Sequence, residues 1–129
     1  MRFALWLAIV YGVVLPAAET WRRWGQVAAG TVWWPQFLDD WILGLLLLGS
    51  VLVWRRDRVI GRRCLIGAWG CVCGLGYGSF FGNLRDVGQA DPSGARHGLA
   101  VAVLGVGWAL AIVALAASVF ARDRGEARV

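Results

Sequence analysis

The stretch "DDWILGLLLLGSVLVWRRDR" (residues 39–58) decides the fold, because an uncharged apolar run is closed by charged residues at both ends. Three further uncharged runs, at residues 3–18, 64–84 and 98–121, are bounded in the same way. The chain is 59% hydrophobic with a mean hydropathy of +0.61, whereas soluble domains are about 45–50% apolar. The sequence therefore predicts an all-α integral membrane protein, a four-helix transmembrane bundle that forms a single domain over residues 1–129.

The apolar part of the quoted stretch is too short to cross a membrane by itself. A helix over residues 41–54 would rise about 21 Å, less than the roughly 30 Å of the hydrocarbon core. A start at Pro35 gives about 30 Å, and proline is favoured at the first helical position. Asp39 and Asp40 would then lie inside the helix. The predicted transmembrane helices cover about residues 3–18, 35–54, 62–84 and 95–121.

A tryptophan-rich segment connects the first two predicted helices. Trp21, Trp24 and Ala28 share one helical face, which is typical of a short helix lying in the membrane interface, here over about residues 20–32. A loop anchored by tryptophans is the alternative. The first run also resembles a signal peptide, but Pro16 stands where cleavage after Ala18 would require a small residue. We therefore expect the first helix to be retained.

All 13 basic residues are arginines, and they are distributed unequally between the two sides of the predicted bundle. Short cytoplasmic loops are enriched in Lys and Arg. We therefore expect a multi-pass protein of the bacterial inner (plasma) membrane with both termini cytoplasmic, and no nucleic-acid partner. One side holds Arg2, Arg55, Arg56, Arg58, Arg62, Arg63, Arg122, Arg124 and Arg128; the other holds Arg22, Arg23, Arg85 and Arg96.

The third run contains glycines at every fourth position, which places them along one face of a helix. We call Gly70, Gly74, Gly78 and Gly82 the glycine strip. Small residues at this spacing let helix backbones approach closely in lipid, where packing drives association. The strip predicts a groove for a neighbouring helix, in the same chain or in a second subunit; a pore lining is the alternative.

Two short similarities suggest an internal repeat. Tyr11-Gly12 and Tyr77-Gly78 are separated by the same offset as "WRRDR" (residues 54–58) and "FARDR" (residues 120–124). Two parallel helix hairpins related by a weak repeat would explain both pairs. Chance matches between apolar segments are the alternative.

The three cysteines do not form a metal or redox motif. Cys64, Cys71 and Cys73 lie in one predicted helix without CxxC spacing, and the chain has a single histidine. We expect them to be small apolar fillers, and we expect no disulfide, metal or cofactor. No catalytic constellation is present, so we expect no enzyme; a redox helper that uses the cysteines is the alternative.

The best candidate site combines acidic residues and one histidine on the side opposite the predicted termini. Its members are Glu19, Asp39, Asp40 and His97, with Arg22, Arg23 and Arg96. Carboxylates at membrane depth are costly and normally pair with other groups. Adjacent residues diverge by about 100° on a helix, so Asp40 lies on the side of Gly44, the expected close-packed side, and Asp39 does not. We expect salt bridges that fix geometry; an ion or proton site is the first alternative, and catalysis the second.

These observations favour a non-enzymatic membrane protein that assembles through the glycine strip, alone or with partners, in the lipid bilayer. The alternative is a small transporter or channel for a proton, cation or small solute that uses the carboxylates. The chain resembles the small multidrug-resistance transporters in its size and number of helices. Those transporters depend on a membrane-embedded glutamate in their first helix, whereas here Glu19 stands only at the end of the first run. A closed salt-bridge cluster would favour assembly, and a water-filled cavity would favour transport.

Overall fold

The computed structural model consists of four α-helices. They are α1 (Arg2–Ala28), α2 (Trp34–Arg56), α3 (Arg58–Arg85) and α4 (His97–Val119). The structure describes residues 1–85, 87 and 97–121, and no strand occurs among them. All four helices are long and apolar enough to span a membrane. The predicted four-helix membrane bundle is thus confirmed, and the chain is a multi-pass membrane protein.

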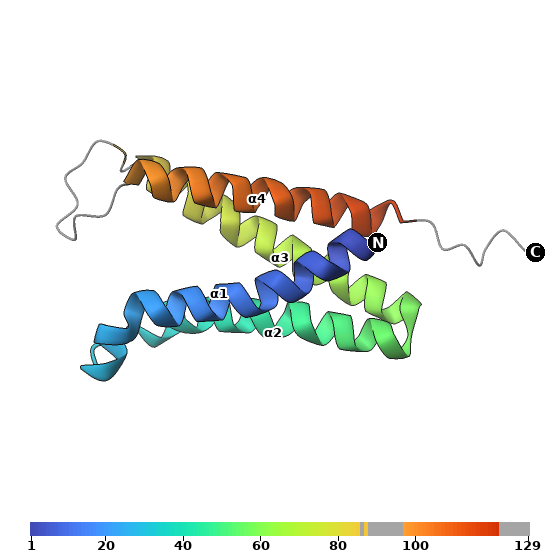
Figure 1. The fold of residues 1–129 in the computed structure, drawn as a ribbon, viewed down its shortest axis with the longest axis horizontal. Coiled ribbons are helices and arrows are strands. Elements are labelled where there is room, and N and C mark those ends of the chain that lie inside the picture. Colours follow the sequence, from blue (N-terminus) through green and yellow to red (C-terminus); the bar gives the residue numbers. More distant parts are fainter. Residues whose placement is uncertain (86, 88–96, 122–129) are drawn as a thin grey trace, which may run out of the picture.

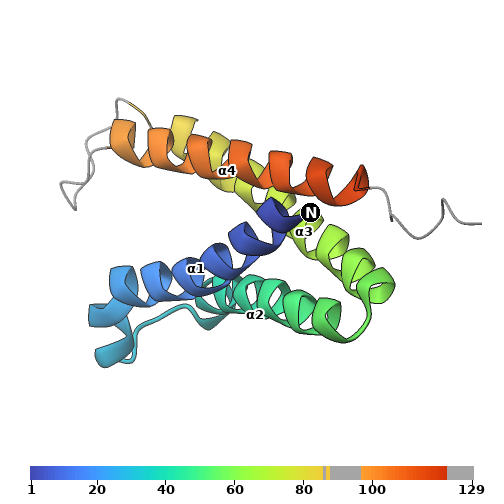
Figure 2. The same cartoon turned by 45° about the vertical axis from the view of Figure 1, so that its right-hand side comes forward.

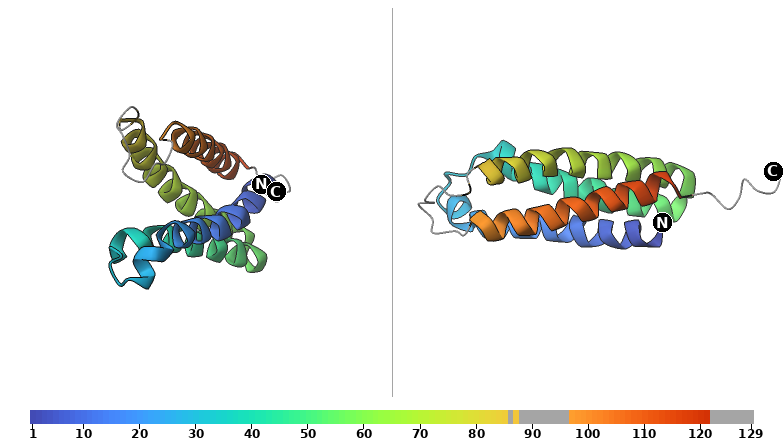
Figure 3. Two further views of the ribbon diagram at one scale, coloured as in Figure 1. Left: turned by 60° about the vertical axis from the view of Figure 1, so that its left-hand side comes forward. Right: turned by 90° about the horizontal axis from the view of Figure 1, so that it is seen from above.

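The helices alternate in direction along the bundle. The N-terminus, the α2–α3 turn and the end of α4 lie at one end, which we call the termini end (Figures 1 and 3). The α1–α2 connection lies at the opposite end, which we call the loop end. Two pairs, α1 with α2 and α3 with α4, diverge toward the loop end (Figures 1 and 2). Consequently α1 meets α4 mainly near the termini end.

The core lies where the two pairs meet. Trp69 of α3 is fully buried there, with Leu47 and Leu65. Tyr11 of α1 contacts the Trp69 ring edge-on, with ring centroids 5.4 Å apart, and its hydroxyl donates a hydrogen bond of 2.7 Å to the Gly107 carbonyl of α4. Alanines allow the close approach of α1 to α4 in this region: Ala4, Ala8, Ala111 and Ala114 are all buried.

Helix α1 does not end after the first apolar run. It continues to Ala28, so the expected separate surface helix over residues 20–32 is wrong, and most of that segment forms the last turns of α1. With 27 residues, α1 rises about 40 Å and extends beyond a 30 Å hydrocarbon core. The tryptophans of these last turns therefore reach the membrane interface as part of the first helix.

Contact with α2 explains why Pro16 does not interrupt α1. Proline has no N–H, so the carbonyl of Gly12 loses its helical hydrogen bond. That carbonyl oxygen lies against Gly44, where an added Cβ would be 2.8 Å from it and 3.0 Å from Pro16 Cδ. The Thr20 hydroxyl donates a hydrogen bond of 2.6 Å to the Pro16 carbonyl. The proline is thus accommodated because α2 has no side chain at the crossing.

The ends of the other helices follow local signals. Helix α2 begins at Trp34, so the expectation that Asp39 and Asp40 lie inside it is confirmed. Only Asp57 separates α2 from α3, and its Oδ1 accepts hydrogen bonds from the N–H groups of Val59 (2.8 Å) and Ile60 (3.0 Å). This cap starts α3 at Arg58, four residues before the predicted start. Helix α4 ends at Val119, two residues before the predicted end, and the predicted start near residue 95 lies outside the described residues.

Candidate functional site

Glu19 forms a closed ion-pair cluster on the last turns of α1. Its side chain is only 4% exposed. Arg22 donates to Oε2 from both Nε (3.0 Å) and Nη2 (2.6 Å), and the Nε of Arg23 donates to Oε1. Both carboxylate oxygens are therefore engaged by guanidinium groups three and four residues away, the spacing at which helical side chains meet. We call these three residues the Glu19 cluster.

The two aspartates of α2 differ in their relation to this cluster. Asp40 is half-buried and interacts electrostatically with Glu19, Arg22 and Arg23. Asp39 is exposed. Neither aspartate forms a hydrogen bond or ion pair with a described residue. Asp40 therefore lies beside the Glu19 cluster without closing another salt bridge.

Two predicted members of the site remain, His97 and Arg96. His97 is the first residue of α4, and its side chain lies outside the part of the chain that the structure describes, as does Arg96. Their place in the candidate site therefore stays a prediction.

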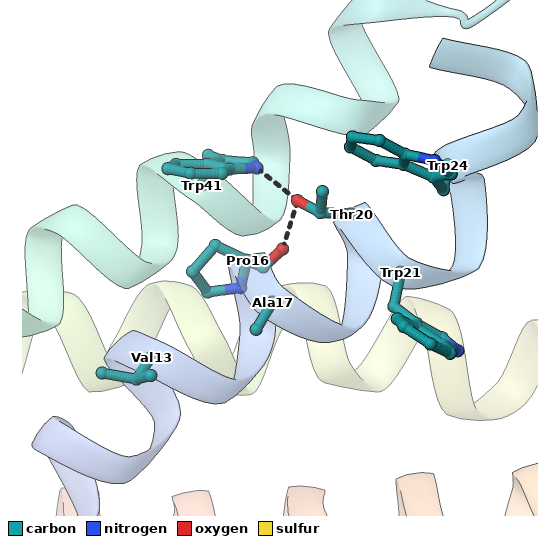
Figure 4. Close-up of a pocket in the computed structure, with 7 residues that line it drawn as sticks. All are labelled: Val13, Pro16, Ala17, Thr20, Trp21, Trp24 and Trp41. Carbon is teal, nitrogen blue, oxygen red and sulfur yellow. Dashed lines mark hydrogen bonds between the residues drawn. The ribbon is translucent and has the colours of Figure 1, made fainter. Parts of the chain in front are cut away.

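A pocket of about 890 Å³ lies between α1 and α2 near the loop end (Figure 4). Its lining residues carry no charge. The Thr20 hydroxyl donates to the Pro16 carbonyl and accepts a hydrogen bond of 3.2 Å from Nε1 of Trp41, so this polar group is already satisfied. The Glu19 cluster is not part of the lining, which consists of Val13, Pro16, Ala17, Thr20, Trp21, Trp24 and Trp41. The pocket is thus an apolar hollow with aromatic walls, and its lining offers no charged group that could bind an ion or proton.

The glycine strip faces away from the rest of the described chain. All four glycines are exposed, and a Cβ added at any of them would meet no described atom within 4 Å. The buried residues of α3, among them Leu65, Trp69 and Val72, lie on the opposite side of the helix. The groove predicted for a neighbouring helix is therefore unfilled by α1, α2 or the described part of α4, and contact with a second chain stays a prediction.

Glycines outside the strip make the close helix contacts. At the α1–α2 crossing, Gly12 and Gly44 face each other, and Gly44 lies on the close-packed side as expected. A Cβ on Gly76 would lie 2.9 Å from Cδ1 of Trp108. The Nε1 of Trp108 donates a hydrogen bond of 3.0 Å to the Cys73 carbonyl. Glycine periodicity did not reveal these positions, because none of them lies in a series of glycines at every fourth position. A signal was present at Gly44, which the sequence placed on the expected close-packed side of α2.

The cysteines show no sign of a shared site. All three are free; Cys64 and Cys71 are exposed, whereas Cys73 is half-buried. Cys71 follows Gly70 and lies on the same exposed face as the glycine strip. Among the described residues, no group of three His, Cys, Asp or Glu side chains could hold a metal ion.

Comparison with protein families, with curated proteins and with solved structures finds no match to this chain.

Proposed function

We propose that this protein is a non-enzymatic component of the bacterial inner membrane that assembles with a second copy of itself through the glycine strip of α3. The observation that carries the proposal is the position of the strip: four glycines in helical register, exposed, with no described neighbour within 4 Å. In a dimer with its two-fold axis along the membrane normal, the same face of each α3 would meet its counterpart.

Glycine weakens a membrane helix unless its small size allows a close contact. A glycine in a helix interior costs about 1 kcal/mol relative to alanine. Four of them on one exposed face therefore weaken α3, and no described residue packs closely against them in return. Close approach of a second helix provides a benefit, because van der Waals contact and weak Cα–H···O hydrogen bonds become available where side chains are missing.

The Glu19 cluster supports assembly over transport. Both oxygens of the Glu19 carboxylate are bound by Arg22 and Arg23. A carboxylate that carries protons or cations must be free to exchange its partner, whereas a doubly paired one holds the end of α1 in place. The uncharged lining of the nearby pocket agrees with this role.

The distribution of arginines supports cytoplasmic termini. The arginine-rich α2–α3 turn lies at the termini end, together with Arg2. Short loops that remain in the cytoplasm carry such an excess of arginine.

The proposal is tested by replacing a glycine of the strip with a large residue. Gly74→Leu places a side chain on the proposed interface, and we expect it to abolish the dimer captured by chemical crosslinking in membranes. Gly49→Leu is the matched control, because Gly49 of α2 also has no neighbour within 4 Å but lies outside the strip. A dimer that survives Gly74→Leu would contradict the proposal, as would a wild-type chain that crosslinks only to other proteins.

A further inference from the structure

Four exposed arginines surround the α2–α3 turn. Arg55 and Arg56 are the last residues of α2, and Arg58 and Arg63 lie in the first two turns of α3. Because only Asp57 separates the two helices, the four guanidinium groups are held at the same end of the bundle. We call these four residues the arginine turn.

The described groups around the turn do not neutralise the arginine turn. The Asp57 carboxylate caps α3 through the N–H groups of Val59 and Ile60. Arg62, which lies between Arg58 and Arg63 in sequence, has a different role: its Nε and Nη2 donate to the carbonyls of Ser118 (3.0 Å) and Val119 (2.8 Å) at the end of α4. None of the four arginines forms an ion pair with a described residue. The turn therefore presents four positive charges and one negative charge.

We propose that the arginine turn binds the phosphate groups of anionic phospholipids. The turn joins two candidate membrane spans, Phe37–Arg56 and Arg58–Arg85, which places its side chains at the level of the lipid headgroups. Arginine binds phosphate through two parallel N–H···O hydrogen bonds, which lysine cannot form. The chain contains arginine at every basic position and no lysine, and four guanidinium groups at one boundary match a surface of phosphates.

This proposal is independent of the glycine strip. Arg56 lies on α2, and the strip begins more than a turn beyond Arg63 along α3. Loss of the dimer in the Gly74→Leu variant would therefore leave lipid binding by each protomer unchanged.

Native mass spectrometry of the detergent-purified chain provides the test, with phosphatidylglycerol as the anionic probe and phosphatidylcholine as the zwitterionic one. We expect phosphatidylglycerol to bind more tightly. Each arginine near an anionic surface contributes about fivefold in affinity. The Arg55→Gln/Arg56→Gln variant should therefore bind it about 25-fold more weakly, and Arg63→Gln about fivefold more weakly. Arg85→Gln, at the loop end, is the matched control and should leave binding unchanged. Circular dichroism of each variant checks that the helices are intact.

Three results would overturn the proposal. Equal binding of the two lipids would show that charge is not recognised. Equal weakening by Arg85→Gln and Arg63→Gln would show that the turn is not the site. A third arm separates lipid from free phosphate: phosphatidylglycerol should raise the unfolding temperature of the purified protein, whereas inorganic phosphate at the same concentration should not. An equal rise with inorganic phosphate would contradict a lipid site.

Discussion

The contact between Gly12 and Gly44 gives the sharpest prediction about the fold. A Cβ on Gly44 would lie 2.8 Å from the Gly12 carbonyl oxygen and 3.0 Å from Pro16 Cδ, so even one added carbon collides with backbone. Overpacking of a tight site costs about 1–3 kcal/mol, and sometimes more. Leucine adds three further carbons, so we expect the Gly44→Leu variant to lose at least about 3 kcal/mol from this collision.

Helix propensity works in the opposite direction. Leucine is favoured over glycine in a helix by somewhat less than 1 kcal/mol. The net expected loss is therefore at least about 2 kcal/mol in the free energy of unfolding, or roughly 30-fold in the ratio of folded to unfolded protein. Reversible unfolding in mixed detergent micelles, followed by far-UV circular dichroism, measures this loss.

A glycine of the strip supplies the comparison. Gly74→Leu adds the same side chain where no described atom lies within 4 Å, so only the gain in helix propensity remains, and the free energy of unfolding of the monomer should rise by somewhat less than about 1 kcal/mol. The measurement is made at a dilution at which the chain is monomeric. If Gly44→Leu unfolds at the same detergent composition as wild type, the account of the α1–α2 crossing is refuted.

Three further substitutions test individual contacts with the same unfolding assay. Glu19→Gln leaves Arg22 and Arg23 without their carboxylate and should lower the free energy of unfolding by about 1–3 kcal/mol. The loss is limited because water can solvate Arg22, which is largely exposed. An unchanged stability would show that the cluster is not structural. Tyr11→Phe removes the hydrogen bond to the α4 backbone and should cost about 0.5–1.5 kcal/mol; a gain in stability would contradict this. Arg62→Gln removes the donors to the last carbonyls of α4 and should speed amide hydrogen exchange there; unchanged exchange would exclude that role.

The number of helices and the membrane setting could be predicted from the sequence because lipid imposes simple requirements. Each span must be about 20 residues long and apolar, and charged residues mark its ends. The same length requirement placed Asp39 and Asp40 inside α2, and the structure agrees. These predictions depend only on local composition and helix rise, so no tertiary contact was needed to make them.

The course of α1 could not be predicted, because it depends on a partner distant in sequence. Pro16 is a helix breaker by local rules, yet Gly44 of α2 makes room for its ring. With the helix expected to end near Ala18, the sequence placed Glu19, Arg22 and Arg23 in one candidate site but did not give the pairing among them. Arg22 and Arg23 pair with Glu19 at helical spacings, which are informative only if one helix continues through all three residues.

The spacing of the glycines likewise did not identify the close contacts between helices. A regular strip shows that a face is flat, but the sequence does not tell which helix covers it. Inside the chain, the tightest contacts fall on Gly12, Gly44, Gly61 and Gly76, which belong to no regular strip. The regular strip of α3 has no described neighbour, and this is why the proposed function places its partner in a second chain.

Oxidative crosslinking through Cys71 tests that central claim most directly. In a chain whose other two cysteines are replaced by serine, Cys71 lies on the exposed glycine face. The account predicts disulfide-linked dimers on mild oxidation in membranes, and none from the chain that retains only the half-buried Cys73. A Cys71 chain that remains monomeric, or that crosslinks no more than the Cys73 chain, would contradict assembly through the glycine strip.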